Sequence, residues 1–413
     1  MTQMPKLQFQ AEYKEIMSEA HSRPPFDIPE NHNVFYLAFS CTQVTAQHVR
    51  MLIDSKAKDS GYRHVIGKLD GWVAKYELHT EFISLYLLVE NTLSKEDVLV
   101  RLANKIDFDL LEINLAIWLQ VASTKKEFRK IFSDWSVFYG GGLREGGEVR
   151  ATLAPDDAGF IDFVVLKGSA KEFTLGRRIQ RLIELETYRV MTLKGLPLAR
   201  SRATELSKLE KKLESISANM NTVAHGEGEK SEAVFKELCA LSNKANHMQS
   251  GSRFRYSASR AYFDLVEQRI DWFDEKKIGG LHMLSAFVSS RLKPAIDTIE
   301  SMGKRQQDLV DDVARVFALL RTRIELNVGK DNQDILRSMS ERHDQQVKIS
   351  QTVEGLSAIA ITYYAVGLVS YFLKVFAKEE IVPISHGMMT ALSIPIVFGL
   401  VILGLRHMRS KWH

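Results

Sequence analysis

Two long apolar runs near the end of the chain constrain its fold more than any other feature. The first lies within "QTVEGLSAIAITYYAVGLVSYFLKVFAKEE" (351–380), and its residues 356–373 include no Asp, Glu, Lys or Arg. These 18 residues of helix rise about 27 Å, close to the roughly 30 Å hydrocarbon layer of a bilayer. The second run, 384–405, also lacks those four residue types. Both runs predict membrane-spanning helices, and the alternative is a hydrophobic hairpin buried in a soluble fold.

Basic residues flank both outer ends of this pair of runs. They are Arg337, Arg342 and Lys348 before the first run and Arg406, Arg409 and Lys411 after the second. Because positive charge favours the cytoplasmic side of a membrane, both outer ends are predicted to be cytoplasmic and the connecting turn to lie outside. The turn "KVFAKEEIVPISHG" (374–387) carries two Lys and two Glu and gives no preference. Trp412 is typical of an interfacial anchor.

The start of the chain and its cysteines favour a cytoplasmic location for the N-terminal bulk. The opening "MTQMPKLQFQAEYKEIMSEA" has neither the apolar core nor the cleavage site of a signal peptide. Cys41 and Cys239 form no Cys-x-x-Cys pair, which suits a reducing compartment and offers neither a zinc site nor a disulfide framework. We therefore expect a protein of the bacterial inner (cytoplasmic) membrane, with the lipid bilayer as a partner and both termini cytoplasmic.

Residues 34–168 have the pattern of a mixed α and β domain. Strands are predicted for 34–40, for both arms of a hairpin turned at Asp70-Gly71, for 81–90, for 111–122 and for a closing hairpin within 146–169. Helices are predicted for 42–61, with Thr42 as N-cap and Gly61 at the end, for 95–106 and for 124–135. This order predicts an α+β layer domain over residues 1–170.

From Thr174, the predicted N-cap of a helix ended by Gly195 and Pro197, the pattern becomes helical. Breaks are expected at "HGEGEK" (225–230), "QSGS" (249–252) and Gly279-Gly280. Residues 303–376 contain no proline and carry apolar residues every three or four positions, as in a packed helix or coiled coil, with a candidate bend at Gly329.

The whole pattern predicts an α+β cytoplasmic head, a long α-helical stalk and two C-terminal transmembrane helices. The domains are 1–170, 171–350 for the stalk, and 351–413 for the transmembrane hairpin with its short basic tail. Because the apolar stripe of the stalk needs a partner, we expect a homo-oligomer, although helices of the same chain can also cover the stripe.

Several long motifs resemble a known bacterial family. They are "RRIQRLIELETYRVMTLKGLPLAR" (177–200), "SRFRYSASRAYFDLVEQRI" (252–270), "LLRTRIEL" (319–326), the first apolar run, "HSRPPF" (21–26) and "HTEF" (79–82). In these motifs the chain resembles the membrane-anchored family filed as domain of unknown function thirty-four twenty-two. It departs from that family at Ser22, where Ala is usual, and at "NVGKDNQD" (327–334). The resemblance implies a membrane-anchored protein without a settled activity.

The order of the parts is also similar to that of CorA-type magnesium transporters. Those proteins carry a Gly-Met-Asn signature at the outer end of the first span. Here that end reads "YFLKVFAKEE" (371–380), and "HGMM" (386–389) at the start of the second run lacks the Asn. The architecture implies an oligomeric divalent-cation channel or transporter as an alternative, without its signature.

A candidate metal or acid/base site lies in "YELHTEF" (76–82). Glu77, His79 and Glu81 alternate, so on a strand all three would point to one face. Carboxylate and imidazole groups bind divalent cations and also form acid/base pairs. His21 and Arg23 of "HSRPPF" would join them if that loop folds over the strand. The alternative is an ordinary solvated strand face, and none of the common hydrolase or nucleotide-binding motifs supports an enzyme.

One face of the first apolar run carries the residues Tyr363, Gly367, Ser370, Tyr371 and Lys374. In an oligomer this face would line an ion path. The alternative is helix packing, in which the glycine lets a neighbour approach, tyrosine hydroxyls pair between helices and the lysine reaches the interface. Glu354 lies at the cytoplasmic edge, where a ring of carboxylates would attract cations and a single one would cap or form an ion pair.

Two further motifs have weaker readings. Glycine-rich "GGGLREGGEVR" (140–150) would hold phosphate only before a helix, and a strand is predicted to follow, so we expect a flexible hairpin loop. In "SRFRYSASR" (252–260) the basic residues Arg253, Arg255 and Arg260 interleave with Phe254 and Tyr256, as in nucleic-acid grooves. Anionic lipid or an acidic partner fits equally well, and no nucleic acid is expected for a membrane-bound chain.

Three functions remain open from the sequence. The first is a membrane-anchored scaffold or interaction protein with an unknown protein partner. The second is the cation channel or transporter of CorA-like architecture. The third is a metal-dependent enzyme in the N-terminal domain that uses Glu77, His79 and Glu81. The cofactor is unknown, with a divalent cation as the candidate.

Overall fold

The computed structural model describes residues 13, 25, 27–54, 63–222, 228–377 and 386–411. Contacts within the chain divide it into two compact units. The first unit consists of Met1–Thr222 and Glu232–Phe317, and the second consists of Val223–Ser231 and Ala318–His413. The predicted division at residues 170 and 350 stays a prediction.

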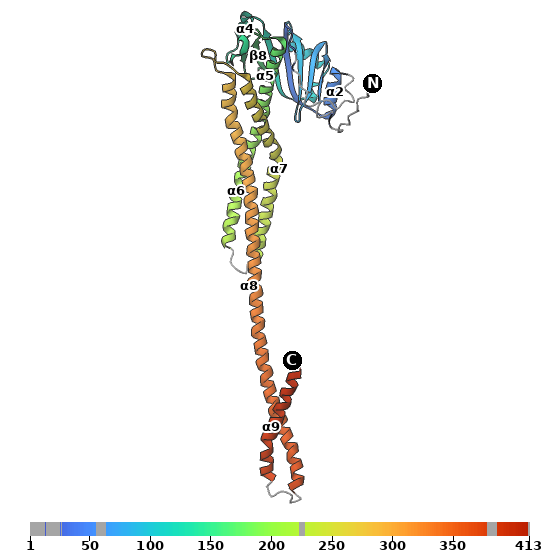
Figure 1. Ribbon diagram of the computed structural model, residues 1–413, viewed down its shortest axis with the longest axis vertical. Helices are drawn as coiled ribbons and strands as arrows, with labels where there is room; N and C mark the ends of the chain where they lie inside the picture. Colours follow the sequence, from blue (N-terminus) through green and yellow to red (C-terminus); the bar gives the residue numbers. More distant parts are fainter. Residues whose placement is uncertain are drawn as a thin grey trace, which may run out of the picture. The chain divides into compact units, whose positions relative to one another are not determined.

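One eight-stranded sheet lies at one end of the first unit (Figure 1). Its strands are β1 (His32–Ser40), β2 (His64–Leu69), β3 (Trp72–Leu78), β4 (Ile83–Glu90), β5 (Glu112–Ala122), β6 (Tyr139–Gly142), β7 (Glu148–Ala151) and β8 (Phe160–Leu166). They lie in the order β2-β3-β4-β1-β5-β8-β7-β6. All neighbours are antiparallel except β5 and β8. This parallel pair requires a crossover connection, which contains α4 (Lys125–Ile131) and the hairpin of β6 and β7.

Two helices, α2 (Gln43–Ile53) and α3 (Lys95–Ala103), cover one face of the sheet. Phe35, Leu37 and Phe39 of β1 belong to the apolar core beneath them. Because side chains alternate along a strand, Tyr36 between them points to the opposite face. The sheet with helices packed on it confirms the predicted α+β architecture. The opposite face of the sheet is available to the helices that follow in the chain.

The predicted caps and turns of this region are mostly confirmed. Thr42 caps α2, and Asp70 and Gly71 form the β2–β3 turn at φ 55° and 92°, as a two-residue hairpin of type I′ requires. The helix is shorter than predicted because it ends at Ile53, where Asp54 is extended. The predicted end at Gly61 lies outside the described residues.

Strand β6 was missed because its glycines predict a loop. A Cβ on Gly140 would lie 2.0 Å from the Val149 carbonyl oxygen, so only glycine fits this approach of β7. Gly142 exchanges backbone hydrogen bonds with Lys276, which covers this edge of the sheet. The hairpin predicted within 146–169 is confirmed as β7 and β8, but residues 140–142, expected to belong to a flexible loop, form part of a closely packed strand.

The first two long helices follow each other almost without a break. Helix α5 (Glu172–Leu193) begins two residues before Thr174, the predicted N-cap. Gly195 and Pro197 were expected to stop the helical region, but Gly195 begins α6 (Gly195–Thr222). Pro197 lies in the first turn of α6, where proline is tolerated. A Cβ on Gly195 would lie 2.5 Å from Ser259 Oγ, so glycine permits close packing against the next helix.

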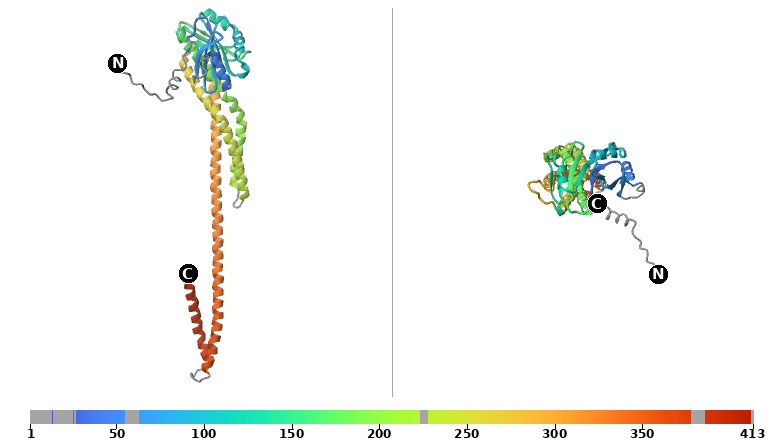
Figure 2. Two further views of the ribbon diagram at one scale, coloured as in Figure 1. Left: turned by 90° about the vertical axis from the view of Figure 1, so that its right-hand side faces the viewer. Right: turned by 90° about the horizontal axis from the view of Figure 1, so that it is seen from above.

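Helix α6, α7 (Gly228–Phe273) and the first part of α8 (Leu284–Ala377) lie side by side in the first unit (Figures 1 and 2). Their buried apolar side chains recur every three or four residues, for example Leu206, Leu209, Leu213 and Ile216 in α6, Leu238, Leu241, Ala245 and Met248 in α7, and Leu292, Ile296, Ile299 and Met302 in α8. Arg305 of α8 donates to Glu210 of α6 at 2.6 Å. This bundle confirms the predicted helical region.

Helix α7 runs without interruption through "QSGS", so the predicted break there is wrong. Ser252 is fully buried, and its hydroxyl donates to Gln306 Oε1 of α8 at 2.6 Å. Packing against α8 therefore outweighs the low helix propensity of serine and glycine. Of the break predicted at 225–230, residues 225–227 lie outside the described part, and α7 begins at Gly228. The break predicted at Gly279-Gly280 is confirmed, because α7 ends at Phe273 and α8 begins at Leu284.

The second unit contains the remainder of α8 and α9 (His386–Lys411). Helix α8 continues through 327–334, so there is no change of secondary structure at Gly329. Helix α9 lies beside the last part of α8 (Figures 1 and 2), and Ser370 Oγ is 3.4 Å from Thr390 Oγ1. Among the described residues, two helices are long and apolar enough to cross a membrane, within Leu284–Lys374 and Gly387–His407.

Candidate functional site

A connected row of buried polar side chains lies on the sheet face opposite to α2 and α3. The Tyr36 hydroxyl is 3.0 Å from Ser84 Oγ of β4 and 2.9 Å from Thr187 Oγ1 of α5. Ser84 Oγ is in turn 3.2 Å from His79 Nε2. The row therefore joins two strands and the β3–β4 turn to the helix that covers this face.

The direction of these hydrogen bonds follows from counting hydrogens. Thr187 donates its only hydroxyl hydrogen to the Ile183 carbonyl at 2.8 Å, so it accepts from Tyr36. Tyr36 must then accept from Ser84, and Ser84 must accept from His79. The proton of His79 therefore lies on Nε2.

A buried ion pair adjoins this row on β3. Lys75 Nζ lies 2.7 Å from Glu77 Oε1, and each residue is only 1% exposed. Glu77 Oε2 is 3.7 Å from His79 Nε2, and His64 Nδ1 of β2 is 3.9 Å from Glu77 Oε1. Burial by itself raises the pKa of Glu77, but the His79 ring and the Lys75 ammonium outweigh it and lower that pKa to about 2.

A second ion pair fixes the β3–β4 turn to α7. Arg255 donates to both carboxylate oxygens of Glu81, at 2.5 and 3.1 Å, in a bidentate pair. The neighbouring His79 ring stacks on Phe82 with 4.3 Å between centroids. In this turn, His79 is thus held by stacking on Phe82, and Glu81 is held by Arg255 of α7.

The structure brings together only part of the predicted metal site. Strand β3 ends at Leu78, so His79 and Glu81 lie in the turn and do not share a strand face with Glu77. Glu77 and His79 are close, but Glu81 pairs with Arg255. His21 and Arg23 lie outside the described residues. Within the described part of the chain, no group of three or more His, Cys, Asp or Glu side chains is arranged to hold a metal ion.

Lys75 is the residue of this site that sequence reasoning missed. It stands two positions before Glu77, so the same alternation that grouped Glu77 with His79 also places Lys75 on that face. Its ammonium neutralises the carboxylate that a divalent cation would need. As arranged, these groups order the helix against the sheet, and the 3.7 Å between His79 Nε2 and Glu77 Oε2 is too long for a hydrogen bond.

The low pKa of Glu77 predicts a specific dependence of stability on pH. Because that pKa is about 2 when folded and about 4.5 when unfolded, the charged carboxylate stabilises the fold above pH 4.5, and this stabilisation is lost as pH falls towards 2. We expect the difference in unfolding free energy between the native chain and Glu77→Gln to shrink over this interval. Urea unfolding at several pH values measures it, and a constant difference would contradict the assignment.

The other sequence motifs do not assemble as binding sites. The segment after the glycine-rich loop is β7, so no helix N-terminus is available for phosphate. In "SRFRYSASR", Arg255 is held by Glu81 and Tyr256 is 7% exposed, whereas Phe254 is 64% exposed. Arg260 bonds Glu300 at 2.8 Å. Basic and aromatic groups therefore do not share one exposed groove.

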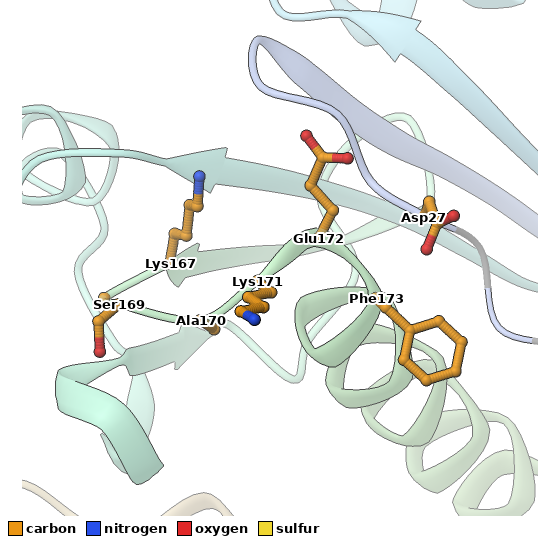
Figure 3. Close-up of a pocket in the computed structure, with 8 residues that line it drawn as sticks. Asp27, Lys167, Ser169, Ala170, Lys171, Glu172 and Phe173 are labelled. Carbon is orange, nitrogen blue, oxygen red and sulfur yellow. The ribbon is translucent and has the colours of Figure 1, made fainter.

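An open hollow that sequence reasoning did not anticipate lies at the start of α5 (Figure 3). Its volume is about 640 Å³, and it is lined by Asp27 and residues 167–173. Lys167 at its edge donates to Glu30 Oε1 at 2.8 Å, so its ammonium is already paired. The hollow offers space but no convergent set of binding groups.

The predicted polar face of the first span is divided by the structure. Tyr363 and Tyr371 are 76% and 74% exposed, and nothing lies within 4 Å of a Cβ built on Gly367. Ser370 instead faces Thr390 of α9. Lys374 is exposed and Glu354 is half-buried. Within one chain, Tyr363, Gly367 and Tyr371 therefore remain available to lipid or to a second helix.

Comparison with known proteins gives a family but no further relative. The model of the family described as "Protein of unknown function (DUF3422)" matches residues 11–412. Neither a curated protein nor a solved structure matches the chain, and the similarity to CorA-type transporters is not confirmed. Because the match extends over nearly the whole length and agrees with the motifs quoted above, the chain belongs to the DUF3422 family.

Proposed function

We propose that the protein is anchored in the bacterial cytoplasmic membrane by two helices, with both termini in the cytoplasm, and that its first unit is a non-enzymatic scaffold that recruits another protein. The single observation that carries the proposal is the exposure of both apolar helices. No residue in the apolar part of α9, within Gly387–His407, is buried. A core helix of a soluble protein would be mostly buried.

Particular side chains illustrate this exposure. Leu356, Leu368 and Phe372 of α8 are between 68% and 73% exposed. Leu392 and Leu400 of α9 are 70% and 64% exposed. A lipid environment removes these surfaces from water, and the basic residues that flank the two runs favour the cytoplasmic side.

The scaffold is favoured over the metal-dependent enzyme by how the buried ionic groups are used. Glu77 is paired with Lys75, and Glu81 with Arg255, inside the first unit. Ser84 and Tyr36 complete each other's hydrogen bonds. Thr187 and Arg255 are the contacts that position α5 and α7 against the sheet, and the outer surface of the first unit remains for a partner.

The predicted topology gives a direct test. Green fluorescent protein fused after His413 is expected to fluoresce, and alkaline phosphatase fused there is expected to be inactive. In the cytoplasm the first reporter fluoresces and the second has no activity. The same result is expected for fusions before Met1, since both termini share one side. Opposite behaviour of the two ends would mean an odd number of spans, and would overturn the proposed two-helix anchor.

Recruitment is tested separately in cells. We expect short-range chemical crosslinking followed by mass spectrometry to recover the same second protein attached to the first unit in repeated preparations. A chain that retains its membrane location but crosslinks only to itself would contradict the scaffold and leave the anchoring intact.

A further inference from the structure

A row of residues on α8 keeps a strict coiled-coil spacing over almost 30 residues. Steps of four and three residues alternate without exception along the row, which we call the seam. It consists of Val328, Asn332, Ile335, Met339, Arg342, Gln346, Ile349, Val353 and Leu356. This spacing averages 3.5 residues, the period at which one helix face follows a supercoiled partner.

The seam is uncovered in the single chain, unlike the helix before it. Leu309, Val313 and Leu320 of α8 are at most 3% exposed. In the seam, by contrast, the exposed fractions are 56% for Ile335 and 65% for Ile349. The same alternation of four and three residues continues beyond the seam through Ala360, Tyr363 and Gly367, which are exposed residues of the first span. The single chain therefore leaves a continuous face from the water-soluble part of α8 into the apolar run.

Charges are scarce beside the seam, where Asp331 flanks its start, and are frequent behind it. The flanking positions from 336 to 357 are Leu336, Ser338, His343, Gln345, Ser350, Thr352 and Ser357, and none is Asp, Glu, Lys or Arg. Arg337, Glu341, Asp344 and Lys348 lie on the outer side of the helix, where Arg337 and Glu341 form an ion pair. From 336 to 357, two identical helices can thus meet with no charged side chain flanking the contact, and Arg342 is the one charged residue of the seam itself.

We infer that a second copy of this chain covers the seam, in a parallel two-stranded coiled coil that continues into the membrane at Gly367. The inference rests on the proposed anchoring, because two copies inserted in the same direction present their seams parallel and in register. A partner of other sequence would have to match both the spacing and the depth of insertion, whereas a second copy does so automatically.

Three polar seam residues fit this arrangement. Asn332 occupies position a of its heptad, where a single asparagine favours a defined register and a coiled coil of two helices. Gln346 occupies the equivalent position two heptads later. The long stem of Arg342 can lie along the contact while its guanidinium reaches water.

Disulfide crosslinking in native membranes tests the inference. In full-length protein with Cys41→Ser and Cys239→Ser, single cysteines replace the seam residues Met339, Ile349 and Val353. Matched controls are Arg337→Cys and Gln351→Cys, which are also exposed but lie on the outer side of α8. We expect at least about tenfold more disulfide-linked dimer from the seam variants, because a disulfide needs Cα atoms within about 4.4–6.8 Å.

The outcomes separate this inference from the anchoring on which it rests. Equal crosslinking of seam and control variants, or none from either, in protein that resists an alkaline carbonate wash overturns the dimer and leaves the anchoring intact. Loss of the protein from washed membranes overturns both. Light scattering of the detergent-solubilised native chain, with detergent mass subtracted, is expected to give two protomers. One protomer, or a closed ring of five, overturns the two-stranded seam.

Discussion

Replacing Lys75 with methionine is expected to lower the unfolding free energy of the first unit by about 3–5 kcal/mol, since removing one partner of a buried ion pair leaves an uncompensated charge. Lys75 and Glu77 are each only 1% exposed and 2.7 Å apart, so little water reaches the remaining carboxylate. Urea unfolding of the full-length protein, followed by the fluorescence of the buried Trp72 and Trp118, measures the change.

Two matched variants isolate the cause of this loss. Lys68→Met removes an exposed lysine from the neighbouring strand and is expected to change stability by no more than about 0.5 kcal/mol. The double variant Lys75→Met/Glu77→Leu removes both charges and is expected to recover most of the loss. If Lys75→Met were as mild as Lys68→Met, the buried pair would not hold this face of the sheet.

Replacing Ile396 and Leu400 together with arginine is expected to remove the protein from the membrane. Both residues lie near the middle of α9 and are 59% and 64% exposed. Each arginine at the centre of a spanning helix costs about 2.5–3.5 kcal/mol of insertion free energy, so the pair costs about 5–7 kcal/mol. The fraction of protein that remains in membranes after a carbonate wash measures the effect.

This experiment distinguishes a lipid-facing helix from a solvent-facing one. At positions exposed to water, arginine would be tolerated within about 0.5 kcal/mol, as expected for the control Val44→Arg on α2, where Val44 is 78% exposed. Retention of the Ile396→Arg/Leu400→Arg chain in washed membranes, at the level of the Val44→Arg control, would show that α9 does not cross the bilayer.

Several elements of the fold could be predicted because their signals are local. Thr42 caps α2 through a neighbouring backbone amide, and the Asp70-Gly71 turn needs two adjacent positive φ angles. The apolar run 384–405 is visible without any partner. Each of these features depends on residues within one or two turns of each other, so composition and spacing suffice.

Features that depend on distant partners were not predictable in this way. The glycines of β6 read as a loop, and their tight approach to Val149 decides that they form a strand. The pair Glu81–Arg255 joins residues 174 positions apart, and it turns Glu81 away from the predicted metal site. Local periodicity contains no information about which segments meet across the sheet.

The sequence by itself determined the α+β region, the helical region, the two apolar helices and the coiled-coil spacing of α8, because hydrophobic periodicity and chain-local caps specify them. Only the tertiary structure decided that Lys75 neutralises Glu77, and that the apolar stripe of α8 is buried near Leu309 but uncovered from Val328 onward. The physical reason is that burial and ion pairing depend on which surfaces of the folded chain come together. Along α8, the same spacing of apolar residues is covered by other helices near Leu309 and uncovered at Ile335.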